Sequence, residues 1–280
     1  MTSYGDFIRS SGRRTAIAAH RGAWRNAPEN SIGALEAAIS MGCEIMETDV
    51  RRSRDGILFH LHDPTLDRMT GASGTAKDLP MSELRELRLR TRMGGSDAPE
   101  TCQTIPTLDD LLEVAKGRIF LDLDVKHPWL FDDVGACVRR HRMQDQINLK
   151  SKLRTPEDLT ALQALQASYC TLVMPQIHFC REDADMLFEL MTQLGPPMVE
   201  AKFDFLETLA SRASKFRSKG VSVWANTLDE VACCGLDDSK ALQDPESVWG
   251  ALNNAGISII QTDEPEALNR YLNGAAIVAE

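Results

Sequence analysis

Charged side chains recur at every second position inside two otherwise apolar segments of this 280-residue chain. Glu47 and Asp49 are separated by one residue, and Asp122, Asp124 and Lys126 repeat that spacing. Successive side chains of a β-strand point to opposite faces, so residues two apart share a face. Buried charges are costly unless they are paired or bind a metal ion. The spacing therefore indicates that each strand directs several charges toward one polar site.

Histidines stand near the ends of two further apolar segments. His20-Arg21-Gly22 ends one segment, and His60 and His62 have the spacing of residues on one strand face. A single histidine or a single strand-end carboxylate is usually structural. The convergence of His, Arg, Glu, Asp and Lys from separate segments favours a catalytic site over unrelated salt bridges.

Short β-rich runs alternate with helical patterns along almost the whole chain. Such alternation implies parallel strands joined by crossover helices, and eight strands suggest a closed (β/α)8 TIM barrel. In this fold the active site lies at the carboxyl ends of the strands, where the charged residues are expected. We predict strands at Thr15–His20, Glu44–Val50, Ile119–Lys126, Gln146–Lys152, Thr171–Ile177, Met198–Phe203, Val221–Asn226 and Ile257–Thr262.

Three helices have clear boundary signals. The pattern Thr-Leu-Asp-Asp at 107–110 predicts a capping box, for a helix that ends at Gly117. The pattern Thr-Pro-Glu-Asp at 155–158 begins a second helix, with proline in its first turn. A third helix is expected from near Asp204 to Gly220.

One segment interrupts the strand–helix alternation. The hairpin signal Asp55-Gly56 follows the second predicted strand too closely for a crossover helix, so residues 57–62 are expected to fold back antiparallel on that strand. Residues 51–104 then form a small insertion subdomain after strand 2, within a single barrel domain of residues 1–280. The arginines beside the turn are expected to be solvated: Arg51, Arg52 and Arg54.

Composition excludes several classes of protein. The net charge is −10, from 31 Lys and Arg against 41 Asp and Glu. An acidic chain without a basic run is a poor candidate for binding nucleic acid. No apolar run approaches the roughly 18 residues of a membrane-spanning helix, and the first twenty residues contain no apolar secretory region. Seven scattered cysteines without a C-x-x-C pair indicate free thiols in a reducing compartment, so a cytoplasmic location is expected.

Five short motifs occur in order near the amino end of the chain. They are Ala19-His20-Arg21-Gly22, Ala27-Pro28-Glu29-Asn30-Ser31, Ile45-Met46-Glu47-Thr48-Asp49-Val50, Asp55-Gly56 and His62-Asp63-Pro64-Thr65-Leu66-Asp67-Arg68. With these motifs the chain resembles the glycerophosphodiester phosphodiesterase family. The likeness continues to about residue 272 through Ile105-Pro106-Thr107-Leu108, Leu123-Asp124-Val125-Lys126, Val223-Trp224 and Ile260-Gln261-Thr262-Asp263. It implies a (β/α)8 barrel with a small insertion after the second strand, in agreement with the strand count.

The resemblance assigns the chemistry to matched residues. It implies that His20 and His62 are the catalytic acid and base, without deciding which is which. It also implies that Glu47, Asp49 and Asp124 bind one divalent cation, and oxygen ligands suit Mg²⁺ or Ca²⁺ better than zinc. Asp124 stands where the family usually has a glutamate, one methylene longer.

The remaining matched residues are expected to bind or support the substrate. Arg21 and Lys126 would neutralise phosphate oxygens, Arg21 with the bidentate geometry of a guanidinium. Glu29 and Asn30 look like first-loop residues that order the site, and Glu29 is also expected near the metal or a substrate hydroxyl. Trp224 is expected to contact the substrate.

The resemblance implies metal-dependent hydrolysis of a small-molecule glycerophosphodiester to glycerol 3-phosphate and an alcohol. The nucleophile is either water or a neighbouring glycerol hydroxyl that first forms a cyclic phosphate. Two other diesters remain alternatives: a sugar-phosphate opine such as agrocinopine, or a lysophospholipid. No lipid-facing helix is evident, which favours a soluble diester. The rim residues that decide the substrate are not diagnostic: Lys152, Gln176, Lys202 and Trp224.

Two other classes of function are weaker alternatives. A metal-dependent amidohydrolase is suggested by His60-x-His62, but that chemistry needs a His-x-His pair at the end of the first strand, where this chain has His20-Arg21. A phosphodiester-binding protein without activity is disfavoured because the acid, base and metal residues are present. The sequence gives no oligomeric state.

Overall fold

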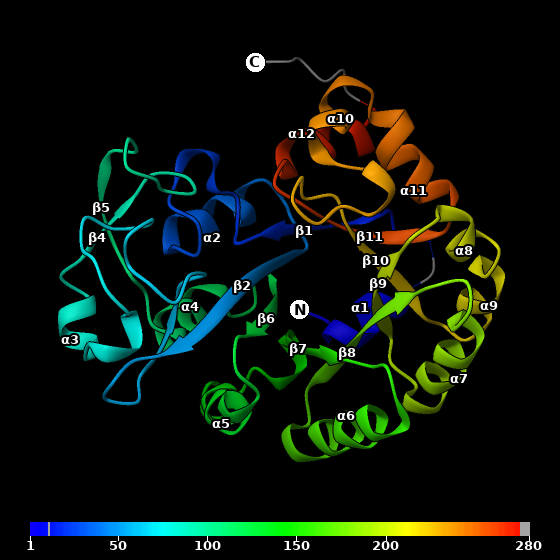
Figure 1. The fold of residues 1–280 in the computed structure, drawn as a ribbon, viewed down its shortest axis with the longest axis horizontal. Coiled ribbons are helices and arrows are strands. Elements are labelled where there is room, and N and C mark those ends of the chain that lie inside the picture. Colours follow the sequence, from blue (N-terminus) through cyan, green and yellow to red (C-terminus); the bar gives the residue numbers. More distant parts are fainter. Residues whose placement is uncertain (11, 275–280) are drawn as a thin grey trace. The chain divides into compact units, whose positions relative to one another are not determined.

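The computed structural model of the chain describes residues 1–10 and 12–274 (Figure 1). In this part of the chain nine strands form one sheet in the order β1-β11-β10-β9-β8-β7-β6-β2-β3, and β1 also pairs with β2. That pairing closes the sheet, so the chain has the predicted (β/α)8-barrel fold. The barrel strands are β1 (Ala16–His20), β2 (Ile45–Arg52), β6 (Phe120–Val125), β7 (Ile147–Lys152), β8 (Leu172–Phe179), β9 (Met198–Phe203), β10 (Ser222–Asn226) and β11 (Ile257–Thr262).

All eight predicted strands are present, each within two residues of its predicted bounds. The contacts divide the chain into two units, one of residues 19–147 and one of residues 1–18 and 148–280. Interpretation of residues 1–280 as a single domain stays a prediction.

The unit of residues 19–147 holds β2, which pairs with β6 in parallel. Their register sets Glu47 beside Asp122 and Asp49 beside Asp124. The remaining elements of this unit are η1 (Trp24–Asn26), α2 (Ile32–Ser40), β3 (Leu58–His60), η2 (Ala76–Asp78), α3 (Met81–Leu84), β4 (Arg88–Arg90), β5 (Glu100–Thr104), α4 (Leu108–Ala115), η3 (Pro128–Leu130), α5 (Phe131–His141) and η4 (Gln144–Gln146).

The predicted hairpin after β2 is confirmed. Strand β3 pairs antiparallel with the end of β2, with Val50 opposite His60. The segment that follows contains α3 and the antiparallel pair β4–β5, which lie together in Figure 1. Side chains of this segment form a hydrophobic cluster that includes Phe59, Met69 and Leu84. An insertion subdomain of residues 51–104 remains our interpretation of this arrangement.

The predicted capping box of α4 is confirmed. Thr107 Oγ1 accepts a hydrogen bond from the Asp110 backbone N–H at 3.1 Å, and Asp110 Oδ2 accepts one from the Thr107 N–H at 2.9 Å. Because these bonds satisfy N–H groups that the first helical turn leaves open, the helix begins at Leu108. It ends at Ala115, two residues before Gly117.

The second unit contains β7 to β11 and, among the described residues, all the helices outside the first unit. The predicted helix start at 155–158 is confirmed: α6 begins at Pro156, and Thr155 and Asp158 form a capping box there. The elements outside the barrel strands are α1 (Tyr4–Arg9), α6 (Pro156–Tyr169), α7 (Ala184–Leu194), α8 (Leu206–Ala210), α9 (Ala213–Ser218), η5 (Cys233–Gly235), α10 (Asp238–Gln243), η6 (Glu246–Gly250), α11 (Ala251–Asn254) and α12 (Pro265–Leu272).

The helix predicted from near Asp204 to Gly220 is wrong as a single element, because two short helices, α8 and α9, replace it. The break falls at Arg212, whose backbone leaves the helical region. Its guanidinium donates to the Thr208 carbonyl at 2.9 Å, and its backbone N–H bonds to Leu209 instead. A side-chain donor thus takes the carbonyl that would continue the helix.

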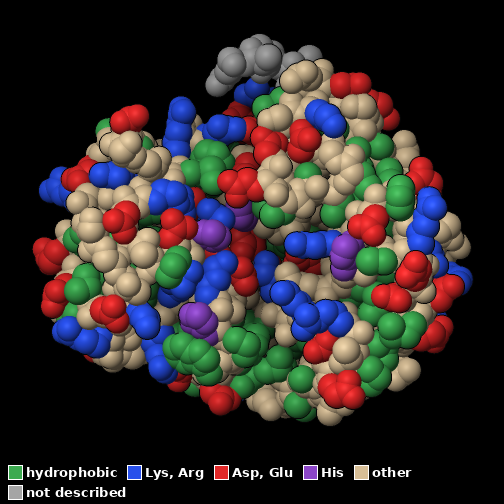
Figure 2. Space-filling view, viewed as in Figure 1, with side chains coloured by type: hydrophobic (Ala, Val, Ile, Leu, Met, Phe, Trp, Pro, Cys, Tyr) green, Lys and Arg blue, Asp and Glu red, His purple; other side chains and the backbone are tan. Residues whose placement is uncertain are grey.

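Two surface properties bear on the partners of the protein. Acidic and basic side chains are interspersed over the face shown in Figure 2. Among the helices of residues 1–10 and 12–274, none combines the length and the hydropathy that membrane crossing requires.

Candidate active site

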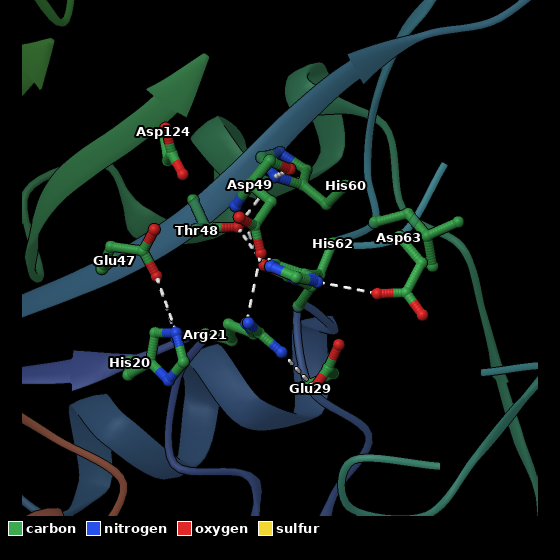
Figure 3. A network of polar contacts seen from close by, with 12 residues as sticks. His20, Arg21, Glu29, Glu47, Thr48, Asp49, His60, His62, Asp63 and Asp124 are labelled. Carbon is green, nitrogen blue, oxygen red and sulfur yellow. Dashed lines mark hydrogen bonds and ion pairs between the residues drawn. The ribbon is translucent and has the colours of Figure 1, made fainter. Parts of the chain in front are cut away.

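Three carboxylates meet at the carboxyl ends of β2 and β6. Oxygen atoms of Glu47, Asp49 and Asp124 all lie within 4.8 Å of one another. Glu47 and Asp49 are 2% and 1% exposed, whereas the Asp124 side chain is one-third exposed. Figure 3 shows these side chains on neighbouring strands with His20 and Arg21 beside them. An all-oxygen cluster of this size and burial fits a hard divalent cation.

Two cationic side chains compensate the carboxylates. Lys126 Nζ lies 2.5 Å from Asp49 Oδ1 and 2.6 Å from Asp124 Oδ2. Arg21 Nε lies 3.4 Å from Asp49 Oδ2. Burial opposes ionisation of Asp49, but Lys126, Arg21 and His62 outweigh it and hold the pKa of Asp49 well below its usual range. Asp49 is therefore ionised across the physiological pH range.

The same charges act in reverse on the two cations. Burial works against the charged form of Lys126, yet Asp49, Asp124 and Glu47 raise its pKa. Burial likewise opposes the Arg21 guanidinium, and the neighbouring carboxylates raise the pKa of Arg21. Both side chains stay positively charged and contribute to an environment suited to an anion.

His20 and Arg21 stand where β1 ends. His20 Nε2 lies 4.0 Å from Glu47 Oε2, and the Arg21 backbone N–H donates to the same oxygen at 3.3 Å. Arg21 has φ +54°, a left-handed conformation that is strained for a side chain of this size. Gly22 follows at φ +84°, and a Cβ there would lie 2.8 Å from the backbone of Ala34. This close approach to α2 fixes the turn that orients Arg21.

His62 is held in one orientation by its neighbours. Its Nδ1 lies 2.7 Å from Asp63 Oδ1, which assigns the Nδ1 proton to that bond and leaves Nε2 for other partners. Asp63 is in turn held by Arg68, whose Nε donates to Asp63 Oδ2 at 2.7 Å. Partial burial of Asp63 is outweighed by bonds from Arg68 and His62, so its pKa falls to about 2. The side chain of His62 is 38% exposed.

Glu29 joins the first loop to the segment after β3. It accepts from Arg21 at 2.9 Å and from Arg68 at 2.6 Å, and it is 2% exposed. A buried carboxylate is expensive unless paired, and here both oxygens meet a guanidinium. The structure thus places Glu29 between two arginines, one of which reaches Asp49 and the other Asp63.

Asn30 connects the two faces of β2. Its Nδ2 donates to Asp49 Oδ2 at 2.7 Å, and its Oδ1 accepts from Thr48 Oγ1 at 2.8 Å and from the Asp49 N–H at 3.1 Å. It has φ +57°, a conformation that asparagine tolerates better than most residues. The Asn30 side chain therefore holds both the carboxylate and the backbone N–H of Asp49.

His60 does not share the environment of His62, contrary to the expectation of a common strand face. Strand β3 ends at His60, so the alternation does not extend to His62. His60 is 1% exposed, and its Nδ1 lies 2.8 Å from Thr48 Oγ1 and 3.1 Å from the Asp49 carbonyl oxygen. Burial, only partly offset by Asp49, lowers the pKa of His60 to about 4. His60 is therefore neutral at pH 7.

Arg51 is also placed differently from the expectation of a solvated turn. Its Nε donates to the carbonyl oxygens of Leu61 at 2.9 Å and His62 at 3.1 Å. The guanidinium thereby fixes the backbone that carries His62. Burial lowers the pKa of Arg51 despite the nearby carboxylates, chiefly Asp49.

The rim residues predicted near the substrate lie in the second unit. Trp224 is fully buried, and its Nε1–H donates to Asn226 Oδ1 at 2.8 Å. Gln176 donates to Glu200 at 2.8 Å. Lys152 and Lys202 are exposed. Substrate contact by Trp224 stays a prediction.

Sequence reasoning missed four supporting residues: Thr48, Arg51, Asp63 and Arg68. Asp63 and Arg68 lie inside the matched motif that contains His62, and their place in this motif could have indicated a supporting role. The roles of Thr48 and Arg51 depend on contacts across a turn, which no local pattern reveals.

The fold and the site define a (β/α)8-barrel protein with carboxylates and cationic side chains gathered at the strand ends. A glycerophosphodiester phosphodiesterase of Caldanaerobacter subterraneus is 26% identical over 266 residues, which are 91% of this chain and 96% of that protein. Over most of its length the chain is therefore similar to a glycerophosphodiester phosphodiesterase. A second relative with this name, from Bacillus altitudinis, is 32% identical over 49% of this chain and 58% of its own length.

Solved structures give the same fold. A glycerophosphoryl diester phosphodiesterase of Parabacteroides distasonis aligns with a TM-score of 0.79 at 19% identity, over 100% of this chain and 95% of that chain. A phosphodiesterase of Oleispira antarctica, solved in complex with the product sn-glycerol-3-phosphate, aligns with a TM-score of 0.65 at 23% identity, over 94% and 98%. Residues 173–272 also match the model of a domain of unknown function.

Proposed function

We propose that this protein is a metal-dependent hydrolase that splits glycerophosphodiesters into glycerol 3-phosphate and an alcohol. The observation that carries the proposal is the convergence of three carboxylates and two cations, with His20 and the oriented His62 beside them. The Oleispira antarctica relative, solved with sn-glycerol-3-phosphate, supports the class of product.

A divalent cation, Mg²⁺ or Ca²⁺, would be held by Glu47, Asp49 and Asp124. The donor set fits, because every available ligand atom is a carboxylate oxygen and the three lie within 4.8 Å of one another. When bound, the cation supplies electrostatic stabilisation to the charge that develops on phosphorus-bound oxygens.

Arg21 and Lys126 bind the diester anion in this proposal. Both remain charged, because the surrounding carboxylates raise their pKa values against the effect of burial. A guanidinium offers paired donors to two oxygens, whereas the ammonium acts as a point charge. Their separate anchoring to Asp49 holds both charges in place before the substrate arrives, which reduces the ordering that binding requires.

His20 and His62 divide the proton transfers. One accepts the proton of the nucleophile, which is water or the neighbouring glycerol hydroxyl, as a new P–O bond forms. The other donates a proton to the departing alcohol oxygen as the old P–O bond breaks. For His62 the bond from Nδ1 to Asp63 makes Nε2 the nitrogen that exchanges protons. The dependence of the rate on the leaving group distinguishes the acid from the base.

The preferred substrate class is a soluble glycerophosphodiester such as glycerophosphocholine. A sugar-phosphate opine such as agrocinopine, or a lysophospholipid, would use the same phosphate chemistry and differ at the alcohol. The amidohydrolase alternative loses support, because His60 is buried against Thr48 rather than directed with His62.

Turnover of glycerophosphocholine tests this proposal. We expect activity to fall to background after EDTA treatment and to return with Mg²⁺ or Ca²⁺. Glu47→Gln should abolish this response, whereas Glu36→Gln should behave as wild type, because Glu36 pairs with Arg118 on an exposed surface. Full activity in metal-stripped protein would overturn the ligand assignment. Absence of turnover on a panel of glycerol, opine and lysophospholipid diesters would overturn the enzymatic function.

A further inference from the structure

A second group of metal-binding side chains lies in the other unit, at the carboxyl ends of β8 and β9. His178 is the penultimate residue of β8, Cys180 follows that strand, and Asp204 follows β9. One ligand atom from each residue lies within 4.8 Å of the other two. We call this group the His-Cys-Asp cluster, and the proposed hydrolysis does not use it.

The contacts inside the cluster bring its donor atoms to one point. His178 Nε2 lies 2.9 Å from Asp204 Oδ1, and the Cys180 sulfur lies within 4.8 Å of a ligand atom of each. The backbone N–H of Cys180 donates to the His178 carbonyl oxygen at 3.1 Å. This tight turn keeps the two side chains near each other. The histidine and aspartate side chains are about half exposed, so a metal ion has access.

The two loops that carry the cluster are held in register. Strands β8 and β9 pair in parallel, with Phe179 beside Phe203. Beyond the strands, the Arg181 guanidinium stacks 4.2 Å from the centre of the Phe205 ring. This contact fastens the segment after Cys180 to the segment after Asp204 and directs the Arg181 charge to the ring.

A third segment braces the backbone of β9 with two further sulfur atoms. Cys233 Sγ accepts from the Phe203 backbone N–H at 3.4 Å, and Cys234 Sγ donates to the Asp204 carbonyl oxygen at 2.9 Å. These bonds fix the peptide unit from which the Asp204 carboxylate extends. The cluster is thus preorganised by three connections rather than assembled from freely moving loops.

We propose that His178, Cys180 and Asp204 form a binding site for a zinc-like divalent transition metal. One nitrogen, one sulfur and one oxygen donor suit Zn²⁺ or Co²⁺ and are unsuited to Mg²⁺ or Ca²⁺. Zn–N and Zn–S bonds of about 2.0 and 2.3 Å put tetrahedral ligand atoms roughly 3–4 Å apart, within reach of small side-chain rotations. Binding exchanges the thiol proton for the metal, and a fourth position stays open to water.

Another group with the same donor types shows what makes this site different. Asp109, Cys137 and His141 also approach within 4.8 Å. There the Arg140 guanidinium lies 2.5 Å from Asp109 Oδ1 and 3.3 Å from Cys137 Sγ. In that group the guanidinium already pairs with both the carboxylate and the sulfur, so these two donors have a partner within the protein. In the His-Cys-Asp cluster the adjacent arginine is engaged by Phe205 instead.

Cobalt titration of the full chain tests the proposal, with excess Mg²⁺ present to saturate the carboxylates Glu47, Asp49 and Asp124. One equivalent of Co²⁺ should produce a thiolate-to-cobalt charge-transfer band in the near ultraviolet, together with the strong visible bands of tetrahedral coordination. Zn²⁺ should displace both. Oxygen ligands cannot give the thiolate band, so failure of the proposed hydrolysis leaves this readout intact.

Matched variants locate the ligands. Cys180→Ser should remove the charge-transfer band, and His178→Gln should weaken cobalt binding at least about tenfold. Cys170→Ser, at an exposed cysteine of the same unit, should change neither. Absence of the band, or its persistence in Cys180→Ser, would overturn the proposal. X-ray absorption of the zinc-loaded wild type needs no variant: one sulfur with nitrogen and oxygen neighbours supports the site, and a shell without sulfur rejects it.

Discussion

The two faces of strand β2 carry polar groups that are stabilised in different ways. On one face, Glu47 and Asp49 are buried carboxylates that opposite charges compensate, chiefly Lys126 at 2.5 Å from Asp49. On the other face, Thr48 meets the neutral His60 through a hydrogen bond of 2.8 Å. We call these the charged face and the neutral face.

The difference teaches how one strand serves both chemistry and support. Charged groups interact strongly with a cation or a phosphate, so the residues of the charged face can contribute directly to ligand binding. The neutral face interacts mainly within the protein and fixes the backbone of Asp49 through His60 and Asn30. Changes beside the charged face should therefore alter turnover, and changes on the neutral face should alter stability.

The largest expected effect concerns the two histidines assigned to proton transfer. His20→Ala or His62→Ala should lower kcat by about 10²–10⁴-fold, the range for loss of a general acid or base. The double variant should lose less than the product of the single losses, because groups that act together are non-additive. Steady-state kinetics of each variant, with His127→Ala as an exposed-histidine control, measures the effect.

Leaving-group dependence assigns the two roles. A nitrophenyl phosphodiester has a leaving group that needs little protonation, so it should rescue the variant that lacks the acid and not the one that lacks the base. The wild-type pH profile of kcat/KM should be bell-shaped, because one histidine must be neutral and the other protonated. Equal rescue of both variants, or of neither, would reject the division into acid and base.

A smaller loss of activity is expected when His62 loses its orienting partner. Asp63→Asn should lower kcat/KM by about 10–100-fold, as found for groups that orient a functional histidine. In the wild type, the Asp63 carboxylate can only accept from His62 Nδ1, at 2.7 Å, and so keeps the proton on that nitrogen. An asparagine amide can donate as well as accept, so it no longer fixes which ring nitrogen carries the proton. The pH profile should also shift, which a purely structural loss would not cause. Asp97→Asn, at an exposed carboxylate, is the control, and wild-type kinetics in Asp63→Asn would contradict the role.

On the neutral face, replacement of His60 should change stability more than turnover. Burial lowers the folded-state pKa of His60 from 6.5 to about 4, so the unfolded chain takes up this proton first as the pH falls. The contribution of His60 is complete above about pH 6.5 and is lost progressively toward pH 4. Denaturant unfolding of the wild type should therefore show stability declining over this window.

The variant His60→Gln should flatten that part of the pH dependence while keeping most of the activity. It should also lower the free energy of unfolding by about 1–3 kcal/mol, the cost of an imperfectly satisfied buried polar group. His127→Gln serves as the exposed control. A loss of turnover as large as that of His62→Ala would erase the distinction between the two faces.

The smallest effect is expected at Asp124. Its side chain is one-third exposed, so the longer glutamate has room, and Asp124→Glu should keep activity within a few-fold or tighten metal binding. Metal titrations monitored by activity give the comparison with the wild type. Asp124→Ala should raise the metal concentration required for activity. An unchanged requirement would transfer the ligand role to another carboxylate, with Asp122 as the first candidate.

The sequence was sufficient to predict the barrel because its strands are specified locally. Alternating charged residues and short apolar runs identify β2 and β6 without knowledge of their partners. The hairpin was predictable for the same reason, since Asp55-Gly56 defines the turn within four residues of β2.

Other features depend on contacts that local patterns do not contain. Arg51 resembles its exposed neighbour Arg54 in sequence, yet its guanidinium reaches carbonyl groups ten residues further on. The break between α8 and α9 depends in the same way on Arg212, which also reaches Asp185 at 2.9 Å. The partners of a long polar side chain are the groups that the folded backbone brings within its reach, so its role follows from the fold and not from the local sequence.

The ion pair between Arg68 and Glu29 limits how this barrel can be recombined with its relatives. A chimera that exchanges residues 51–104 for a foreign segment removes Arg68 and leaves one oxygen of the buried Glu29 without its guanidinium. It also removes the partner that holds Asp63. The first loop and the inserted segment therefore depend on each other structurally, and grafts should succeed only when both are transferred together.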